Sequence, residues 1–147
     1  MRAPSLILAM VAMVGCSQAQ DWSLAENRMW IERMPAGPKD MVKQLAFVND
    51  EGQRVGVDAK SSRYRMMLDL FMWEQQGAEV RMVYPQTDTR LIKKVRAWKC
   101  AGEAPRPFEL CLELGAQRYF SREDWVIRDL AHASAPGPWT ARDDATE

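Results

Sequence analysis

Few side chains in this 147-residue sequence belong to types that perform catalysis or bind metals. His132 is the single histidine, which excludes mechanisms that need two histidines and most zinc sites. Two acidic pairs suggest hydrolysis, Glu109 with Glu113 and Asp69 with Glu79. All four carboxylates are expected on the outer face of strands, where solvated carboxylates are ordinary. We therefore expect no catalytic residue, no metal ligand and no cofactor.

A basic stretch that contains an aromatic residue is the second candidate. Five cationic residues surround Trp98: Arg90, Lys93, Lys94, Arg96 and Lys99. Such a strip could bind nucleic acid, but 20 Lys+Arg balance 20 Asp+Glu, and zero net charge argues against that partner. We interpret the stretch as a solvated edge strand whose lysines block unwanted pairing. The alternative is a partner-binding edge with Phe71, Trp73 and Trp98 as exposed aromatic residues.

The first residues have the pattern of an export signal. Arg2 precedes an apolar run over residues 6–14, which predicts a signal peptide over residues 1–15. That run is far shorter than the roughly 20 residues that span a bilayer. Residues 13–16 resemble a bacterial lipobox, which implies a lipid on Cys16 and, with Ser17 next, sorting to the outer membrane. The alternative cleavage site follows Ala19 and yields a soluble secreted or periplasmic protein.

The two remaining cysteines, Cys100 and Cys111, are an even pair in an exported protein, which favours one disulfide bond. Alternation places both on the outer face of adjacent strands, on either side of residues 101–107. A bond there would close a loop of about a dozen residues. The alternative is a pair of buried thiols.

Alternating apolar residues separated by turn signals predict an all-β domain. The strands are expected at 29–31, 41–49, 53–59, 64–74, 78–84, 91–100, 108–114 and Gln117–Ser121. A capping box from Ser23 to Glu26 could instead begin a short helix before the first strand. At the other end, residues 125–127 could add a last strand, or residues 121–124 could begin a short helix.

Turn chemistry predicts the register of the hairpins. Residues 50–52 form a three-residue loop that ends in glycine, which sets Phe47 opposite Val55. A later turn at Gly115 and Ala116 suits a two-residue loop and sets Glu113 opposite Arg118.

The second hairpin holds the most ligand-like feature. A three-residue loop over 75–77 sets Met72 opposite Val80, so that alternate residues of 64–74 point into the interior. This inward row and the residues opposite it are the candidate ligand-binding residues: Tyr64, Met66, Leu68, Leu70, Met72, Met82 and Tyr84. Methionines line adaptable apolar pockets, but they also fill gaps in cores, and both interpretations remain open.

The strands follow one another in sequential hairpins, which predicts one antiparallel meander of seven to eight strands. We expect it to close into a small up-and-down barrel, because closure removes the edges. The predicted organisation is a signal peptide over 1–15, a polar linker over 16–28, the barrel over 29–131 and a disordered tail over 132–147.

Val14-Gly15-Cys16, residues 47–52 and residues 64–84 with the Gly77 turn together carry a family resemblance. The sequence resembles small bacterial lipoproteins with lipocalin-like or calycin-like barrels. The resemblance implies a non-catalytic envelope lipoprotein, membrane-anchored through its lipid, that binds a small apolar ligand or a protein partner.

Residues 114–119 are similar to the Ser-Gly-x-x-Tyr loop of membrane-bound lysozyme inhibitors, which are disulfide-bearing β-barrel lipoproteins. This second resemblance implies the alternative function, an inhibitor-like or structural envelope protein that acts through its surface.

Overall fold

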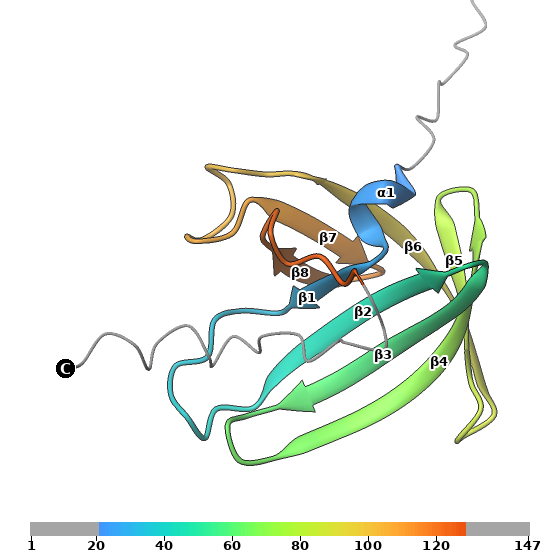
Figure 1. Ribbon diagram of the computed structural model, residues 1–147, viewed down its shortest axis with the longest axis horizontal. Helices are drawn as coiled ribbons and strands as arrows, with labels where there is room; N and C mark the ends of the chain where they lie inside the picture. The colour runs from blue at the N-terminus through green and yellow to red at the C-terminus, as the bar shows by residue number, and fades with distance from the viewer. Residues whose placement is uncertain (1–20, 129–147) are drawn as a thin grey trace, which may run out of the picture.

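The computed structural model describes residues 21–128, which form a closed barrel of antiparallel strands (Figure 1). The elements in chain order are α1 (Trp22–Ala25), β1 (Arg28–Ile31), β2 (Val42–Asp50), β3 (Gln53–Ser61), β4 (Met66–Gln76), β5 (Glu79–Tyr84), β6 (Thr89–Lys99), β7 (Leu110–Leu114) and β8 (Gln117–Ser121). Each strand pairs with the next, and β1 pairs with β8 to close the barrel. The predicted all-β meander and its closure are confirmed. The signal peptide, Cys16, His132 and the predicted tail lie outside the described residues.

The turn between β2 and β3 is one residue shorter than predicted. Only Glu51 and Gly52 lie outside the ladder, and both have positive φ, 49° and 88°. Positive φ at both central positions defines a type I′ turn, whose twist matches that of the flanking strands. The register therefore shifts by one residue, and Phe47 lies opposite Gly56 rather than Val55.

The turn between β4 and β5 is also a two-residue turn, formed by Gly77 (φ 62°) and Ala78. Positive φ at the first central position suits a type II′ turn. Met72 consequently lies opposite Val83 rather than Val80. An odd shift of register moves every side chain of a strand to the opposite face of the sheet. The row that we predicted to point inward therefore points outward.

The third hairpin has the predicted register. Gly115 has φ 61° and begins the two-residue turn between β7 and β8. Glu113 lies opposite Arg118, and the two form an ion pair of 2.6 Å on the outer face.

Large apolar side chains fill the barrel interior, and seven of the eight strands contribute to this core. Its largest members include Trp30, Phe47 and Phe71, none more than 1% exposed. The strand without a side chain in this interior cluster is β3, which instead supplies Gly56. A Cβ atom at Gly56 would lie 2.0 Å from Cζ of Phe71. Glycine is therefore required here, because the Phe71 ring lies against the backbone of β3.

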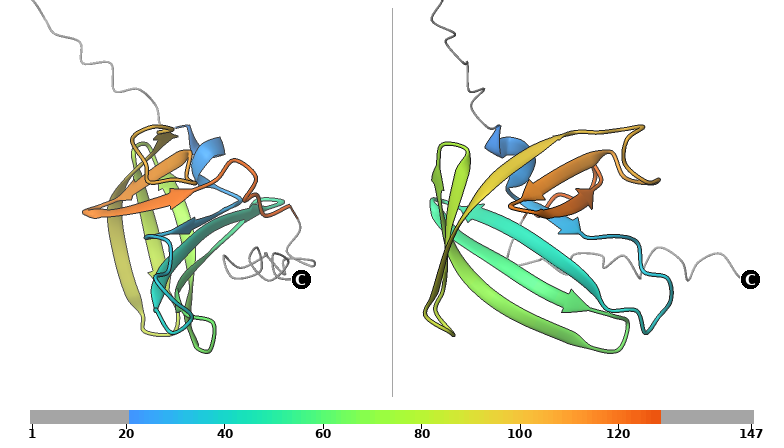
Figure 2. Two further views of the ribbon diagram at one scale, coloured as in Figure 1. Left: turned by 90° about the vertical axis from the view of Figure 1, so that its left-hand side faces the viewer. Right: turned by 180° about the vertical axis from the view of Figure 1, so that it is seen from behind.

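Helix α1 covers one end of the barrel. The Asp21 carboxylate caps it by accepting a hydrogen bond from the backbone N–H of Ser23 (3.0 Å), so the helix begins earlier than the predicted capping box. Trp22 stacks on Trp73 with ring centroids 5.3 Å apart. The predicted polar linker over 16–28 is therefore wrong in its described part, because Trp22 and Ala25 belong to the core. The turn between β3 and β4 lies at the opposite end of the barrel (Figures 1 and 2).

A second apolar cluster lies on the outside of the barrel, where β1 meets β8. Its members come from β1, β2, β8 and the segments that flank β7 and β8: Met29, Ile31, Val42, Ala104, Phe108, Phe120 and Trp125. The chain after β8 completes the seam, because the backbone N–H of Met29 donates to Trp125 O (3.2 Å) and Val126 pairs antiparallel with Arg28. Residues 125–127 thus lie along β1, but they are joined to it by an isolated bridge and do not form a further strand.

Candidate functional site

The outer face of β4 is the most unusual surface of the described chain. Four outward side chains of this strand are between 42% and 67% exposed, namely Met66, Leu68, Leu70 and Met72. Tyr64 precedes them with 65% exposure, and Val55 of β3 lies opposite Met72. We call these six residues the outer β4 face. Single exposed apolar residues are normal, but a contiguous row along one strand is a feature of interaction surfaces.

The outer β4 face contains five of the seven candidate ligand-binding residues: Tyr64, Met66, Leu68, Leu70 and Met72. Our prediction that they point into the barrel is wrong. Phe71 and Trp73 occupy the interior positions of the same strand and are 1% and 2% exposed. The prediction that these two aromatic residues are exposed is wrong for the same reason. A continuous strand keeps its alternation, and burying two large aromatic rings outweighs the exposure of smaller neighbours.

The other two candidates, Met82 and Tyr84, do face the interior, where they are core residues. The Tyr84 hydroxyl donates a hydrogen bond to Oδ2 of Asp58 over 3.2 Å. Burial, together with the charge of Asp58, raises the pKa of Tyr84 well above its ordinary value. Burial likewise raises the pKa of Tyr119, on the inner side of β8, to about 12. Both tyrosines therefore remain neutral at physiological pH and serve packing.

A shallow hollow adjoins the outer β4 face. It is lined by Val55, Met72 and Val83, and by the cationic residues Arg54 and Arg81. Arg54 lies over the Trp73 ring, 5.1 Å from its centroid. Glu74 also lines the hollow and lies 3.9 Å from Arg81, so the apolar row continues into a surface with charges of both signs.

The first half of β4, from Met66 to Leu70, also has an unpaired edge. The β4–β5 ladder begins at Met72 and Val83 and extends toward the Gly77 turn, so Met66 to Leu70 have no strand partner on that side among the described residues. The two strands diverge here (Figure 1). The Gln86 carboxamide donates to Leu70 O (2.8 Å) and accepts from Leu70 N–H (3.1 Å) when its nitrogen faces that oxygen. The Gln86 side chain thus forms, at Leu70 alone, the backbone hydrogen bonds that a neighbouring strand would otherwise form.

The prediction that the basic stretch is an edge strand is wrong, because β6 pairs with β5 on one side and with β7 on the other. The Trp98 ring contacts two guanidinium groups, with Arg96 Cζ 4.5 Å and Arg118 Cζ 5.7 Å from its centroid. Lys99 forms an ion pair of 2.9 Å with Glu123. Trp98 is half-buried, whereas most of the cationic residues are exposed, so the stretch is a charged surface around a partly covered tryptophan.

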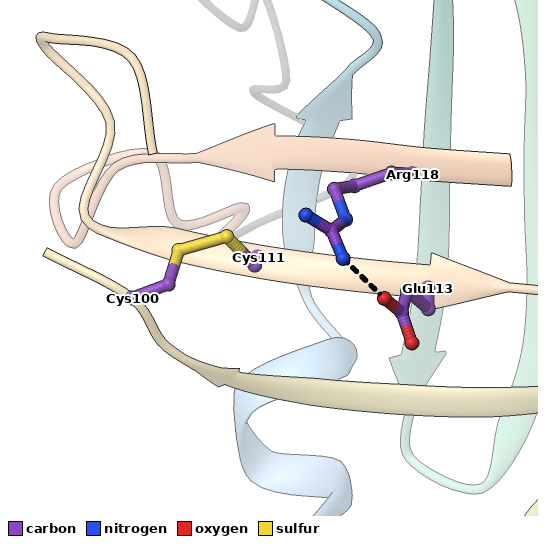
Figure 3. The surroundings of a disulfide bond; sticks show 4 residues. All are labelled: Cys100, Cys111, Glu113 and Arg118. Carbon is purple, nitrogen blue, oxygen red and sulfur yellow. Dashed lines mark hydrogen bonds and ion pairs between the residues drawn. A yellow bond between two sulfur atoms is a disulfide. The ribbon is translucent and has the colours of Figure 1, made fainter. Parts of the chain in front are cut away.

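The disulfide bond is present and joins Cys100, after β6, to Cys111 of β7 (Figure 3). Cys111 alternates with the core residues Leu110 and Leu112 and so points outward, as predicted. Both cysteines are nevertheless no more than 2% exposed. The bond therefore belongs to a covered region of the barrel exterior.

Both members of the first acidic pair are engaged by other groups. Glu113 is engaged by Arg118, and the Glu109 carboxylate accepts from the backbone N–H of Glu123 (3.0 Å). Asp69 corrects one prediction, because it shares the inner face of β4 with Phe71 rather than the outer face. Within residues 21–128, no group of three or more potential ligands could hold a metal ion.

The turn that resembles the lysozyme-inhibitor loop is short and tightly paired. Tyr119 lies in β8 opposite Leu112, and its side chain is 3% exposed. Tyr119 is therefore a core residue of β8 rather than an exposed loop residue.

Comparison with known proteins finds no matching family model, no similar curated protein and no similar solved structure. The closed eight-stranded barrel is consistent with a calycin-like architecture. Among the helices of the described residues, none has the length and apolar character needed to cross a bilayer.

The outer β4 face was not predicted, although the sequence contains a signal for it. Gly56 interrupts the Val55-Gly56-Val57 stretch, and a glycine inside a strand marks a position where another group approaches closely. An inward Gly56 places Val55 and Val57 outside, and pairing with β4 then places Leu70 and Met72 outside as well.

Proposed function

We propose that this protein is an exported cell-envelope lipoprotein, anchored through Cys16, that has no catalytic activity and binds a protein partner through the outer β4 face. The observation that carries the proposal is the row of exposed apolar side chains on β4 opposite a filled interior. Burying this row against a partner removes apolar surface from water, at about 25 cal/mol per Å².

The interior supports a protein partner rather than a small apolar ligand. Trp30, Phe47, Phe71 and Trp73 occupy the barrel centre, and Trp22 of α1 covers one end. A ligand inside the barrel would have to displace these rings, whereas a partner at the outer β4 face displaces only water.

The anchor also favours a protein over the anchoring membrane as the partner. Five residue steps connect Cys16 to Asp21, a reach of at most about 17 Å. The eleven residues of β4 extend over roughly 36 Å. The turn that precedes β4 lies at the end of the barrel away from α1 (Figures 1 and 2). A lipid on Cys16 would therefore direct the beginning of β4 away from its own membrane.

Lipid attachment is tested by metabolic labelling with a fatty-acid analogue. The native chain should be labelled, and Cys16→Ala should not, because only Cys16 follows the lipobox-like stretch. Labelling that survives the substitution would contradict the anchor.

Partner binding is tested with a photo-crosslinking residue at position 70 and, as the control, at position 118, in the cell envelope. Arg118 also points outward from its strand, but it is paired with Glu113. We expect one discrete adduct from position 70, lost when Met72→Glu is added, and none from position 118. A diffuse or identical pattern from both positions would contradict the proposed site.

A further inference from the structure

The main chain of Met66 and Leu68 faces the open edge of β4. Leu70 directs both its N–H and its C=O to Gln86, on the side away from β3. Backbone groups in a strand alternate between its two sides, so Met66 and Leu68 direct theirs the same way. Arg65 O, by contrast, accepts from Ser62 N–H over 2.8 Å within the β3–β4 turn. A strand edge with unpaired backbone groups is a template for another strand.

We propose that this edge pairs with the same edge of a second copy of the chain, antiparallel and about a two-fold axis at Met67. The proposal goes beyond the proposed function, because an edge-to-edge pairing leaves the outer faces of both strands open to a further partner. In this register Met66 lies opposite Leu68 of the partner subunit, and Leu68 lies opposite Met66 of the partner subunit. Both are hydrogen-bonded pairs, because the backbone groups of Met66 and Leu68 already face outward. The Gln86 amide ends the ladder at Leu70.

Charge complementarity selects this register. Arg65, the turn residue that directly precedes β4, would lie on the side of Asp69 of the partner subunit, and the two-fold axis repeats the pair. Both side chains are exposed, and neither forms a salt bridge with another residue of the 21–128 range. Opposite charges that face each other across two strands stabilise a pairing, whereas like charges oppose it. Moving the axis to Leu68 would separate Arg65 from Asp69 of the partner subunit and lose both pairs.

The apolar row supports the same arrangement. On the outer side, Met66 would contact Leu68 of the partner subunit, and Tyr64 would lie near Leu70 of the partner subunit. Each pair joins two side chains that are exposed in the single chain. A C₂ pairing is closed, so the edge ends in a dimer and not in a fibre.

Disulfide trapping tests the register. Met67 would face Met67 of the partner subunit in a non-hydrogen-bonded pair, where Cα atoms lie about 4.5 Å apart, close enough for a disulfide. In a Cys16→Ala background, Met67→Cys should form a covalent dimer under mild oxidation at least tenfold faster than Ile92→Cys. Ile92 is the matched control, with 58% exposure against 62% for Met67. Equal rates, or faster trapping by Leu68→Cys, would overturn the proposed register.

Exchanging the charges of Arg65 and Asp69 supplies an independent test that requires no introduced cysteine. Sedimentation of the full chain should show a reversible dimer that Asp69→Arg weakens at least tenfold, because Arg65 then faces an arginine. Adding Arg65→Asp to Asp69→Arg should restore the dimer. A chain that remains monomeric at all concentrations, or a double variant without recovery, would overturn the pairing. If position 70 still gave a discrete adduct of another mass, the second copy would be rejected and the proposed function retained.

Discussion

The outer β4 face and the outer surface around the disulfide, formed by β7, β8 and the end of β6, lie on the same barrel and differ in how their large side chains are covered. Near β7, the disulfide is buried, Trp98 lies beneath two arginines, and Glu113 is paired with Arg118. On β4, methionines and leucines of comparable size have no such cover within residues 21–128.

The two surfaces contribute to different properties, the covered one to the stability of the fold and the exposed one to binding. Covered apolar groups contribute to folding, because their area is removed from water in the isolated chain. Exposed ones contribute little until a partner removes the water. The comparison therefore predicts that substitutions on the two sides of β4, or in the two outer regions, have effects of very different size.

The largest contrast lies between two adjacent residues. Phe71→Ala should lower the free energy of unfolding by about 3–5 kcal/mol, because it removes a buried ring and leaves a cavity. Leu70→Gln should change it by less than about 0.5 kcal/mol, since that side chain is exposed. Urea denaturation of both variants measures the difference. Equal losses would mean that the outer β4 face is covered in the isolated chain.

Removal of the disulfide should cause the next-largest loss of stability. Cys100→Ala combined with Cys111→Ala should destabilise the barrel by about 2–4 kcal/mol, because the bond constrains the unfolded chain across a separation of 11 residues. Thermal unfolding with and without reductant checks the same effect. A double variant as stable as the native chain would show that the covered region does not depend on its bond.

Substitution of Gly56 on β3 tests the packing that places Phe71 on the inner face of β4. Gly56→Ala should cost about 1–3 kcal/mol, because the new Cβ would overlap the Phe71 ring. Adding Phe71→Leu to this variant should recover part of the loss, since the smaller side chain leaves room. Without recovery, the clash with Phe71 would not be the cause.

The buried tyrosines predict a loss of stability in alkali. Burial raises the pKa of Tyr119 to about 12, whereas an unfolded tyrosine titrates near 10. The folded state thus retains a proton that the unfolded state releases, so the contribution is complete below pH 10 and disappears as pH rises toward 12. The free energy of unfolding should fall by about 2 kcal/mol over this range. Tyr119→Phe should flatten the profile, and an unchanged profile would contradict the assignment.

Among the substitutions that remove a contact, the smallest effect is expected on the charged surface. Arg118→Ala removes an exposed ion pair with Glu113 and a contact with Trp98, which together should contribute about 0.5–1 kcal/mol. Chemical denaturation at low and high salt measures it, and the loss should shrink as salt rises. A loss as large as that of Phe71→Ala would place Trp98 in the core.

Much of the fold could be predicted because its signals are local. The all-β class, the β7–β8 register and the Cys100–Cys111 bond follow from alternation, turn residues and cysteine pairing. The β7–β8 register was predictable because Gly115 marks the start of a turn that accepts one loop length and agrees with the Glu113–Arg118 pair.

The candidate site could not be predicted in the same way. A loop that contains glycine accepts two or three residues, and one residue more or less exchanges the faces of a strand. For β4 both faces are plausible from the sequence: one presents Met66, Leu68 and Leu70, and the other presents Phe71 and Trp73. Trp22 of α1, far away in the chain, stacks on Trp73 and favours the second choice.

The sequence by itself thus determined the strand meander, the disulfide pair and the absence of a multi-histidine centre. These depend on residue type and on neighbours within a few positions. Only the tertiary structure decided which side of β4 faces the core. That choice depends on Gly56 making room for Phe71, on α1 covering Trp73 and on β5 diverging beyond Met72, which are contacts between segments distant in the chain.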